Sequence, residues 1–368
     1  MIEELRLENF KSHRDTTLRG LGRITAVVGA NGVGKSSVLE AVHYLHQLGL
    51  KPAGRILWGP RRNPERLARM ASSGLGLSCR GRSGSIDYEA ILAWERNGPR
   101  WDVRVNEQPV SFTNDRCDLA PELAAVVSQA VYFRFEASRL AEPSYAETLR
   151  PRLEFDGYGL ATVVRSLMTG DPEAYQRFEE RVKSVVPTVK KIRVQNTTIR
   201  RRNARTARID GQDLAFTTED EIIGDELLFD TTDGRGIAGA QMSAGTLYVV
   251  GLFAAFALER RPEIVLLDDV EAGLHPHAQR ELVKTLRKLT DEEAERPLQL
   301  LMTSHSPYVI DELEPEEVWV LGRDAAGAVR AARLSEHANA REALKVLTLG
   351  ELWSAEGEDW VGDAKGGA

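Results

Sequence analysis

Residues 29–36 read Gly-Ala-Asn-Gly-Val-Gly-Lys-Ser, and this stretch decides the fold. Its spacing is that of the phosphate loop G-x-x-x-x-G-K-[ST], whose backbone N–H groups surround the phosphates of a nucleoside triphosphate. The mainly apolar stretch 23–28 (RITAVV) predicts a strand that leads into the loop. Residues 36–46 carry apolar side chains at helical spacing, so this helix would direct its positive N-terminus at the phosphates. We therefore expect a strand–loop–helix unit that binds a nucleotide with Mg²⁺.

Within this loop each residue type has its own task. The glycines at 29, 32 and 34 permit backbone conformations that turn N–H groups inward. Lys35 can reach the β- and γ-phosphates, and the Ser36 hydroxyl can bind Mg²⁺. The residues predicted to bind the nucleotide here are Gly29, Asn31, Gly32, Gly34, Lys35, Ser36 and Ser37.

A second motif, IVLLDDVE at residues 264–271, ends a predicted buried strand in acidic residues. Ligands of open α/β sheets bind at the carboxyl ends of the strands. Asp268 could therefore hold Mg²⁺, and Asp269 stands where a general base could orient the attacking water. The alternative is a strand that simply ends in solvated acids.

Two shorter motifs accompany these. MSAGT at residues 242–246 opens an apolar helix, in which Ser243 is either a plain N-cap or, with Gly245, part of a second phosphate-binding surface. LLMTSHSP at residues 300–307 describes a strand that delivers His305 to its end, where the imidazole could contact a γ-phosphate.

Taken together and in this order, the four motifs resemble the ABC-type ATPases of the RecF, structural-maintenance-of-chromosomes (SMC) and OLD-nuclease branch. The N-terminal residues LENFKSH also resemble the first strand and loop of that branch. The resemblance covers about 1–48 and 240–322 well, and the middle of the chain only loosely. It implies an α/β P-loop NTPase fold, namely an ABC-type ATPase head with a mixed parallel and antiparallel sheet and a helical and β insertion lobe.

The resemblance also implies how the residues act. Two subunits of a homodimer, or of a higher oligomer, would enclose two ATP molecules with Mg²⁺. Ser243 and Gly245 of one subunit would complete the site of the other, and His305 would stabilise the transferring charge. Lys11 resembles a nucleotide-contacting residue of the loop after the first strand, and residues 273–276 resemble the D-loop at the dimer interface.

Departures from the family pattern concern the base. Asp269 and Val270 stand where the branch usually has Glu and Pro. Because Asp is one methylene shorter, its carboxylate reaches less far, and Glu271 could share the role, so hydrolysis is expected to be slow. A Q-loop glutamine is not identified, since Gln129 precedes a strand rather than follows one.

The motifs divide the chain into a discontinuous core and an insertion. Alternating residues predict antiparallel strands in the first part of the insertion, helical spacing follows, and a basic β segment completes it. Residues 51–84 are rich in Arg, Pro and Gly and look irregular, with a short helix near 64–71. The expected boundaries are 1–50 and 240–350 for the core, 51–239 for the insertion (β part about 75–135, helical part about 158–186, basic β segment about 188–230) and 351–368 for a tail.

The formal net charge is −7 over 368 residues, so any nucleic-acid contact needs a local basic patch. Arginines cluster at 55–82, and arginines and lysines cluster at 190–208. Each cluster either contacts phosphates or a partner, or is a solvated surface. The candidates for contact are Lys190, Lys191, Arg200, Arg201 and Arg202.

The longest apolar stretch, 246–258, is too short to span a bilayer, and the N-terminus carries no signal peptide. We therefore expect a cytoplasmic protein without a membrane partner. The absence of sustained heptads excludes a chromosome-scale SMC protein.

Three functions remain open. The first is an ATPase whose nucleotide-switched dimer regulates a separately encoded effector, a nuclease or toxin acting on DNA or RNA, in anti-phage defence. Related OLD-type proteins carry a nuclease domain after the ATPase, and too few residues follow His305 for one, so we expect none in this chain. The second is a RecF-like DNA repair ATPase that binds duplex DNA directly. The third is a transporter ATPase subunit, which the divergent signature and the long interval between Lys35 and Ser243 disfavour.

Overall fold

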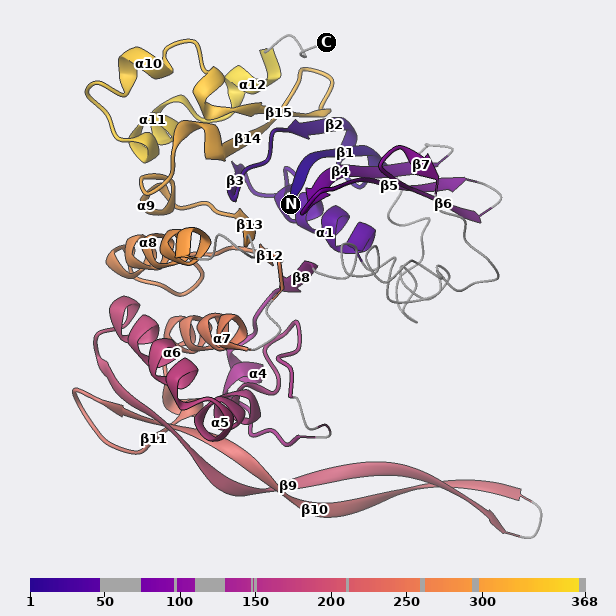
Figure 1. The fold of residues 1–368 in the computed structure, drawn as a ribbon, viewed down its shortest axis with the longest axis vertical. Helices are drawn as coiled ribbons and strands as arrows, with labels where there is room; N and C mark the ends of the chain where they lie inside the picture. Colours follow the sequence, from indigo (N-terminus) through magenta and orange to yellow (C-terminus); the bar gives the residue numbers. More distant parts are fainter. Residues whose placement is uncertain are drawn as a thin grey trace. The chain divides into compact units, whose positions relative to one another are not determined.

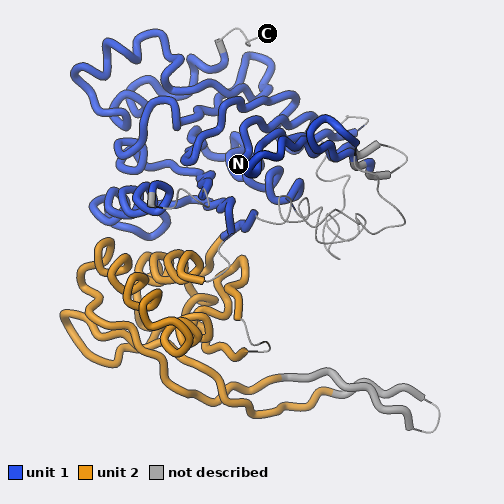
Figure 2. Tube along the Cα trace, in the orientation of Figure 1, with its two compact units in different colours: residues 1–133, 262–368 blue, residues 134–261 orange. Residues whose placement is uncertain are grey.

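The computed structural model describes residues 1–46, 74–95, 98–109, 130–146, 148, 151–209, 212–258, 262–292 and 298–363. They belong to two compact units, residues 1–133 with 262–368 and residues 134–261 (Figure 2). This division groups residues differently from the expected boundaries at 51 and 239. The first antiparallel strands of the expected insertion belong to the first unit, and the helix after MSAGT belongs to the second.

A mostly parallel sheet organises the first unit (Figure 1). Its strand order is β15-β14-β3-β13-β12-β8, and only β15 runs antiparallel to its neighbour. Because the carboxyl ends of the parallel strands share one edge, the motifs that follow β3, β12 and β13 meet there. The bounds are β3 Ile24–Gly29, β8 Ala130–Phe133, β12 Ile264–Leu267, β13 Gln299–Thr303, β14 Val318–Arg323 and β15 Val329–Arg333.

Continuous apolar runs explain the central strands. Every residue of β3, β12 and β13 is buried, as expected for parallel strands covered on both faces. Helix α1 (Lys35–His46) contacts strands of this sheet and also β1 and β4 of a second sheet. Helix α8 (Pro276–Glu292) follows β12 and precedes β13 in the chain.

The second sheet is antiparallel, in the order β2-β1-β4-β5-β6-β7. Strand β4 lies where two expectations overlap, the irregular stretch 51–84 and the β part that begins at about 75, and the structure agrees with the second. Leu75, Leu77 and Cys79 alternate with more exposed residues, a signal that the neighbouring arginines and glycines obscured. The helix expected near 64–71 lies outside the described residues. The bounds are β1 Ile2–Phe10, β2 His13–Arg19, β4 Leu75–Ser83, β5 Ile86–Glu95, β6 Gly98–Val105 and β7 Gln108–Pro109.

Helices and a long hairpin form the second unit. The helices expected at 158–186 are confirmed as α5 (Leu160–Gly170) and α6 (Pro172–Val185). The β segment expected at about 188–230 forms a hairpin of β9 (Val189–Ile209) and β10 (Gln212–Thr231), which extends beyond the helices of its unit (Figure 1). The shorter elements are α4 Ala137–Ala141, β11 Ile237–Ala238, η3 Gly239–Gln241 and, after them, α7 Ala244–Ala257.

The C-terminal region is more ordered than a tail. Helix α11 (Leu349–Glu356) begins at a capping box formed by Thr348 and Glu351, and α12 (Asp359–Asp363) follows it. Leu352 and Val361 are buried at 0% and 1% exposure, so these helices pack on the first unit. The remaining elements are α9 Pro307–Ile310, η4 Pro315–Glu317, η5 Leu334–Glu336 and α10 Ala340–Ala343.

Within the described part of the chain, we find no helix with the length and apolar character needed to cross a membrane.

Candidate nucleotide site

The phosphate loop connects β3 to α1 at the carboxyl edge of the sheet. Gly29 and Gly34 have φ values of +142° and +121°, a region that L side chains rarely adopt. A Cβ atom at Gly29 would lie 2.5 Å from the carbonyl oxygen of Leu321, and one at Gly34 would lie 2.3 Å from Ser12 Oγ. Both positions therefore require glycine.

Lys35 points into this loop. Its Nζ donates to the carbonyl oxygens of Gly29 at 3.0 Å and Ala30 at 3.1 Å. Burial lowers the pKa of the Lys35 ammonium, and the carboxylates that follow β12 oppose this shift. The ammonium thus lies where the phosphates of a bound nucleotide are expected. Of the other predicted ligands in the loop, Asn31 is exposed and Ser37 is buried.

Three side chains brace the loop from outside. Arg323 donates to the carbonyl oxygen of Gly32 at 2.9 Å, Ser12 Oγ to that of Val33 at 3.1 Å, and His13 Nε2 to that of Gly34 at 3.1 Å. Burial lowers the pKa of His13 to about 4, so the ring is neutral near pH 7 and Nε2 carries its proton. The turn between β1 and β2 therefore supports the loop.

Lys11 belongs to the same turn but has a different partner. Its ammonium forms an ion pair with Glu40 of α1. The expected nucleotide contact of Lys11 stays a prediction, since the side chain would have to leave this carboxylate.

Two oxygen ligands meet between the loop and β12. Ser36 Oγ donates to Asp268 Oδ1 at 2.9 Å. A hydroxyl and a carboxylate this close, both oxygen donors, fit Mg²⁺, which prefers oxygen ligands and retains several waters.

Further hydroxyls fix the Asp268 carboxylate, and the sequence did not reveal them. Thr303 Oγ1 donates to Oδ1 at 2.7 Å, and the Tyr132 hydroxyl donates to Oδ2 at 2.9 Å. Thr303 ends the strand between β3 and β12, so its position could have been inferred from that strand order. Tyr132 lies on β8, and nothing in its sequence shows that β8 pairs with β12.

The two acids proposed as bases have different surroundings. Asp269 is exposed, has a φ of +49°, and donates its backbone N–H to Thr303 Oγ1 at 2.8 Å. Glu271 Oε1 accepts the backbone N–H of His305 at 2.6 Å, and its Oε2 is buried without a hydrogen-bond partner in the described chain. Glu271 thus holds the segment that carries His305, whereas the Asp269 side chain faces solvent.

The segment after His305 is connected to the D-loop. Ser306 caps α9 and donates its hydroxyl to Gln279, which in turn donates to the carbonyl oxygen of Leu274 at 2.8 Å. The geometry therefore couples the two loops through one amide side chain.

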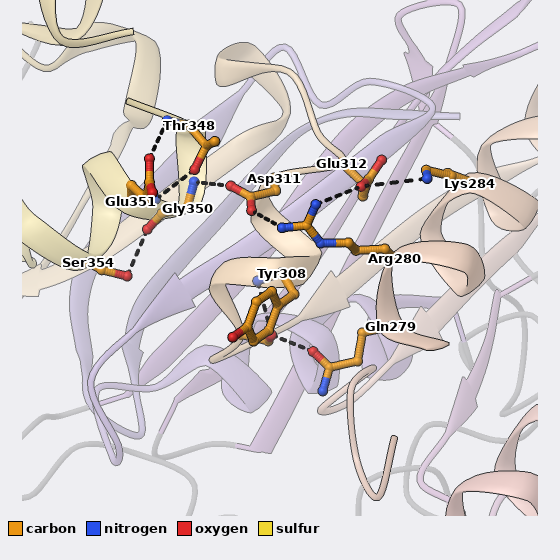
Figure 3. A network of polar contacts seen from close by, with 11 residues as sticks. Gln279, Arg280, Lys284, Tyr308, Asp311, Glu312, Thr348, Gly350, Glu351 and Ser354 are labelled. Carbon is orange, nitrogen blue, oxygen red and sulfur yellow. Dashed lines mark hydrogen bonds and ion pairs between the residues drawn. The ribbon is translucent and has the colours of Figure 1, made fainter. Parts of the chain in front are cut away.

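The same segment is also anchored to the C-terminal helices, as Figure 3 shows. Arg280 of α8 donates to Asp311 Oδ2 at 2.8 Å, and Asp311 Oδ1 accepts the backbone N–H of Gly350 at the start of α11 at 2.8 Å. A Cβ at Gly350 would lie 2.2 Å from the carbonyl oxygen of Pro307, so α11 sits directly against α9.

In the second unit, the MSAGT motif begins α7. Ser243 is the N-cap and accepts the backbone N–H of Thr246 at 3.2 Å, while Gly245 is buried. Plain helix capping is therefore observed. Ser243 is also exposed, which leaves it accessible to a second molecule.

The basic candidates lie on β9 opposite acidic residues. Lys190, Lys191, Arg200 and Arg201 are exposed, and the side chain of Arg202 lies outside the described residues. The register places Lys191 opposite Asp230 and residues 200–202 opposite the acids of 219–221. Throughout the hairpin, β9 has basic but no acidic residues, and β10 has acidic but no basic ones.

The other arginine cluster is described only at its end. Arg80 and Arg82 pair with Glu89 and Asp87 of the neighbouring strand at 2.8 Å and 2.7 Å. Its residues up to 73 lie outside the described residues.

A phosphate loop follows one strand, an acid pair follows a second, and a histidine follows the strand between them, which is the arrangement expected of an ABC-type P-loop nucleotide site. Comparison with known families agrees. Residues 24–311 match the family model described as "AAA domain, putative AbiEii toxin, Type IV TA system", and the chain belongs to this family.

Among curated proteins, the similarities are confined to short segments. An 88-residue segment is 39% identical to the "DNA double-strand break repair Rad50 ATPase" of Archaeoglobus fulgidus, and 43 residues are 44% identical to the "DNA replication and repair protein RecF" of Chlorobium phaeobacteroides. A 57-residue segment is 35% identical to an "ATP/GTP phosphatase" of Helicobacter pylori. These segments cover 24%, 12% and 16% of this chain, and only 9%, 12% and 15% of the respective relatives.

Solved structures of SMC heads share the fold. The "SmcHead bound to the C-winged helix domain of ScpA" superposes with a TM-score of 0.60 at 14% identity, covering 94% of this chain and 99% of that one. A Pyrococcus furiosus complex of the "Smc head domain with an extended coiled coil" superposes with a TM-score of 0.54 at 12% identity, again covering 94% of this chain and 99% of that one. The predicted ABC-type ATPase fold is thereby confirmed.

Proposed function

We propose that this chain binds and hydrolyses ATP with Mg²⁺ at the site between the phosphate loop and β12. The observation that carries the proposal is the convergence of Ser36 and Asp268, 2.9 Å apart, beside the buried Lys35. Hydroxyl and carboxylate would hold the metal, and the ammonium and the backbone N–H groups of the loop would hold the phosphates.

The acids after β12 would divide the chemistry. Asp269, exposed at the end of the strand, would orient the attacking water as general base. Glu271 would keep the backbone of His305 in place, so that the imidazole faces the transferring phosphoryl group. Hydrolysis would be slow, since the aspartate side chain is short.

The working form would be a homodimer. Ser243 and Gly245 of one subunit would approach the phosphates bound by the other, because an exposed helix N-terminus favours an anion. ATP would therefore tighten association, and hydrolysis would loosen it.

The biological role would be to switch a separately encoded effector, a nuclease or toxin acting on nucleic acid, in a cytoplasmic anti-phage system of the OLD-like kind. The description of the matching family, which names a toxin and a type IV toxin–antitoxin system, supports such a setting. A RecF-like repair ATPase is the second candidate, supported by the short similarities to Rad50 and RecF. The acids opposite the basic residues of β9 weaken that candidate, because they offset a phosphate-binding charge.

Binding of a fluorescent ATP analogue tests the site itself. Lys35→Ala should abolish binding, whereas Lys345→Ala, which removes an exposed lysine of the C-terminal region, should bind like the wild type. If Lys35→Ala retains full affinity, the phosphate-loop assignment is wrong.

A pull-down from the native host tests the role. The wild type with a slowly hydrolysed ATP analogue should capture a specific protein that Lys35→Ala does not. Capture of duplex DNA alone, with strong salt dependence, would favour the repair candidate instead.

A further inference from the structure

We propose that Tyr132 is a positioning residue for the carboxylate that binds Mg²⁺. The proposal rests on the Mg²⁺–ATP site above. It adds a residue of β8, an edge strand that carries none of the four sequence motifs.

The contact is direct and enclosed. β8 pairs in parallel with β12, and Tyr132 lies opposite Leu266, two residues before Asp268. The hydroxyl donates to Asp268 Oδ2 at 2.9 Å, and both residues are 8% exposed. The ring is also supported from α1, where His43 lies with its centroid 5.6 Å away.

The donors around the carboxylate are unevenly distributed. Ser36 and Thr303 both donate to Oδ1, whereas the described contacts give Oδ2 a single donor, Tyr132. A carboxylate held at both oxygens cannot rotate about its Cβ–Cγ bond. Tyr132 therefore keeps Oδ1 directed at Ser36, which is the orientation a shared metal ion needs.

Loss of the hydroxyl should consequently affect the metal more than the nucleotide. Without its donor, Oδ2 would be a buried, charged and unpartnered acceptor, and the carboxylate would turn to find another. Outer groups that orient a metal ligand typically change metal affinity 10–100-fold when removed. Lys35 Nζ is held by the carbonyl oxygens of Gly29 and Ala30, and the phosphate loop is braced by Ser12, His13 and Arg323, so binding of metal-free nucleotide should persist.

The position of Tyr132 in the chain adds significance to this contact. The backbone N–H of Asp268 lies 3.5 Å from the carbonyl oxygen of Phe133, the last residue of the first unit before the chain enters the second. The metal carboxylate is therefore tied by side chain and backbone to the end of the strand that leads into the unit carrying Ser243.

The test compares Tyr132→Phe with Tyr88→Phe. Tyr88 is buried in the same unit, and its hydroxyl has no partner among the described residues, so its removal matches the chemical change without touching the site. Affinity for a fluorescent ATP analogue is measured in EDTA and across a Mg²⁺ titration, together with the melting temperature.

We expect Tyr132→Phe to bind the analogue in EDTA within about twofold of the wild type and to need about tenfold more Mg²⁺ for half-saturation. Tyr88→Phe should match the wild type in both. An unchanged Mg²⁺ requirement in Tyr132→Phe, or an equal loss of affinity with and without Mg²⁺, would overturn the inference. A wild type that binds no nucleotide at any Mg²⁺ concentration would instead overturn the proposed site.

A second variant keeps the test decisive if Tyr132→Phe folds poorly. Tyr132→Phe/Asp268→Asn removes the charge together with its donor, so no buried charged oxygen is left unpartnered. Its Mg²⁺ requirement should equal that of Asp268→Asn alone, because the hydroxyl then has no carboxylate to orient. A further increase over Asp268→Asn would contradict the proposal.

Discussion

Asp269 and Glu271 stand two residues apart, yet their carboxylates are held differently. Glu271 is engaged by the backbone of His305, while Asp269 is exposed in a left-handed backbone conformation. Such conformations persist where the surrounding structure imposes them, often at reactive sites. The bond from Asp269 N–H to Thr303 and the bond from Thr303 to Asp268 supply that constraint.

Substitution of these acids should separate their roles. Asp269→Asn should slow ATP turnover at least tenfold, about 1.4 kcal/mol of barrier, with nucleotide binding retained. Glu271→Gln should be milder than Glu271→Ala, because the amide oxygen can still accept the His305 N–H. Steady-state kinetics checks this. A Glu271→Gln variant as slow as Glu271→Ala would make Glu271 the base.

A buried histidine should make folding stability depend on pH. Burial lowers the pKa of His46 to about 4, while the bond from Nδ1 to the carbonyl oxygen of Val42 partly opposes the shift. The pKa of His46 is near 6.5 in the unfolded chain and about 4 in the folded chain, so between these pH values only the unfolded chain takes up the proton. The stability that is present above pH 6.5 is therefore lost as the pH falls. Between pH 7 and pH 5 the free energy of unfolding, measured with urea, should fall by about 2 kcal/mol less in His46→Leu than in the wild type.

A matched substitution controls this pH comparison. His277→Leu removes an exposed histidine and serves as the comparison for the loss of an imidazole. Equal pH dependence in the wild type and His46→Leu would show that His46 does not contribute.

For single residues of the candidate site, the sequence predicts the roles of those that lie within one local motif. Lys35 and Ser36 follow from local spacing, and Asp268 from the apolar run before it. Thr303 and Tyr132 act on Asp268 through strand pairing, which depends on contacts between distant segments. Their roles were therefore not visible before the sheet order was known.

Among the elements, the β9–β10 hairpin is the least expected. A two-stranded ribbon has little core of its own, so cross-strand pairs must help to stabilise it. Arg200 and Glu221 face each other with 3.6 Å between charged atoms, and Arg201 lies over the ring of Tyr145. The alternating apolar pattern that predicts strands is weak here, so the length of β9 could not be predicted from that pattern.

Charge reversal on one strand should loosen the hairpin, and reversal on both should restore it. Replacing Arg200, Arg201 and Arg202 by Glu places acids opposite acids, at about 0.2–1 kcal/mol for each pair. Hydrogen exchange of residues 196–201 and 217–224 should then accelerate. Adding Arg at 219, 220 and 221 re-creates opposite charges and should return exchange to the wild-type rate.

The variant with reversed charges on β9 and the variant with reversed charges on both strands also show why nucleic-acid or partner binding is lost, if it is. Binding lost in both would locate the contact on the arginines of β9. Binding lost only after reversal of one strand would result from the opened hairpin.

Strands with a continuous apolar run were predicted well, whereas β4 and α12 gave weaker signals. β3, β12 and β13 are buried on both faces, so their composition alone identifies them. β4 is buried on one face, and α12 is anchored mainly by Val361, so both resemble irregular polar segments in sequence.

For the whole molecule, the candidate site residues are divided between two units. Lys35, Ser36, Asp268 and Asp269 belong to the first, and Ser243 to the second. In the proposed homodimer each site combines the first unit of one subunit with the second unit of its partner, as a two-fold axis requires of identical interfaces.

Mixing of inactive variants should reveal such shared sites. Lys35→Ala and Ser243→Arg should each be inactive, but a mixed dimer would contain one site with both residues intact. If sites act independently, an equal mixture should regain up to roughly a quarter of wild-type turnover, since half of randomly paired dimers are mixed.

The control mixture is Lys35→Ala with Asp269→Asn. Both residues belong to the first unit, so every site in a mixed dimer retains one of the defects. Recovery in both mixtures, or in neither, would contradict a site composed across the dimer.

The bracing of the phosphate loop by Ser12, His13 and Arg323 has a kinetic consequence. Because these hydrogen bonds already fix the loop, it loses little conformational entropy when it binds the nucleotide. Diffusional encounter of the nucleotide with the site, rather than rearrangement of the loop, should then limit the association rate. Different nucleotides should therefore differ chiefly in their dissociation rates.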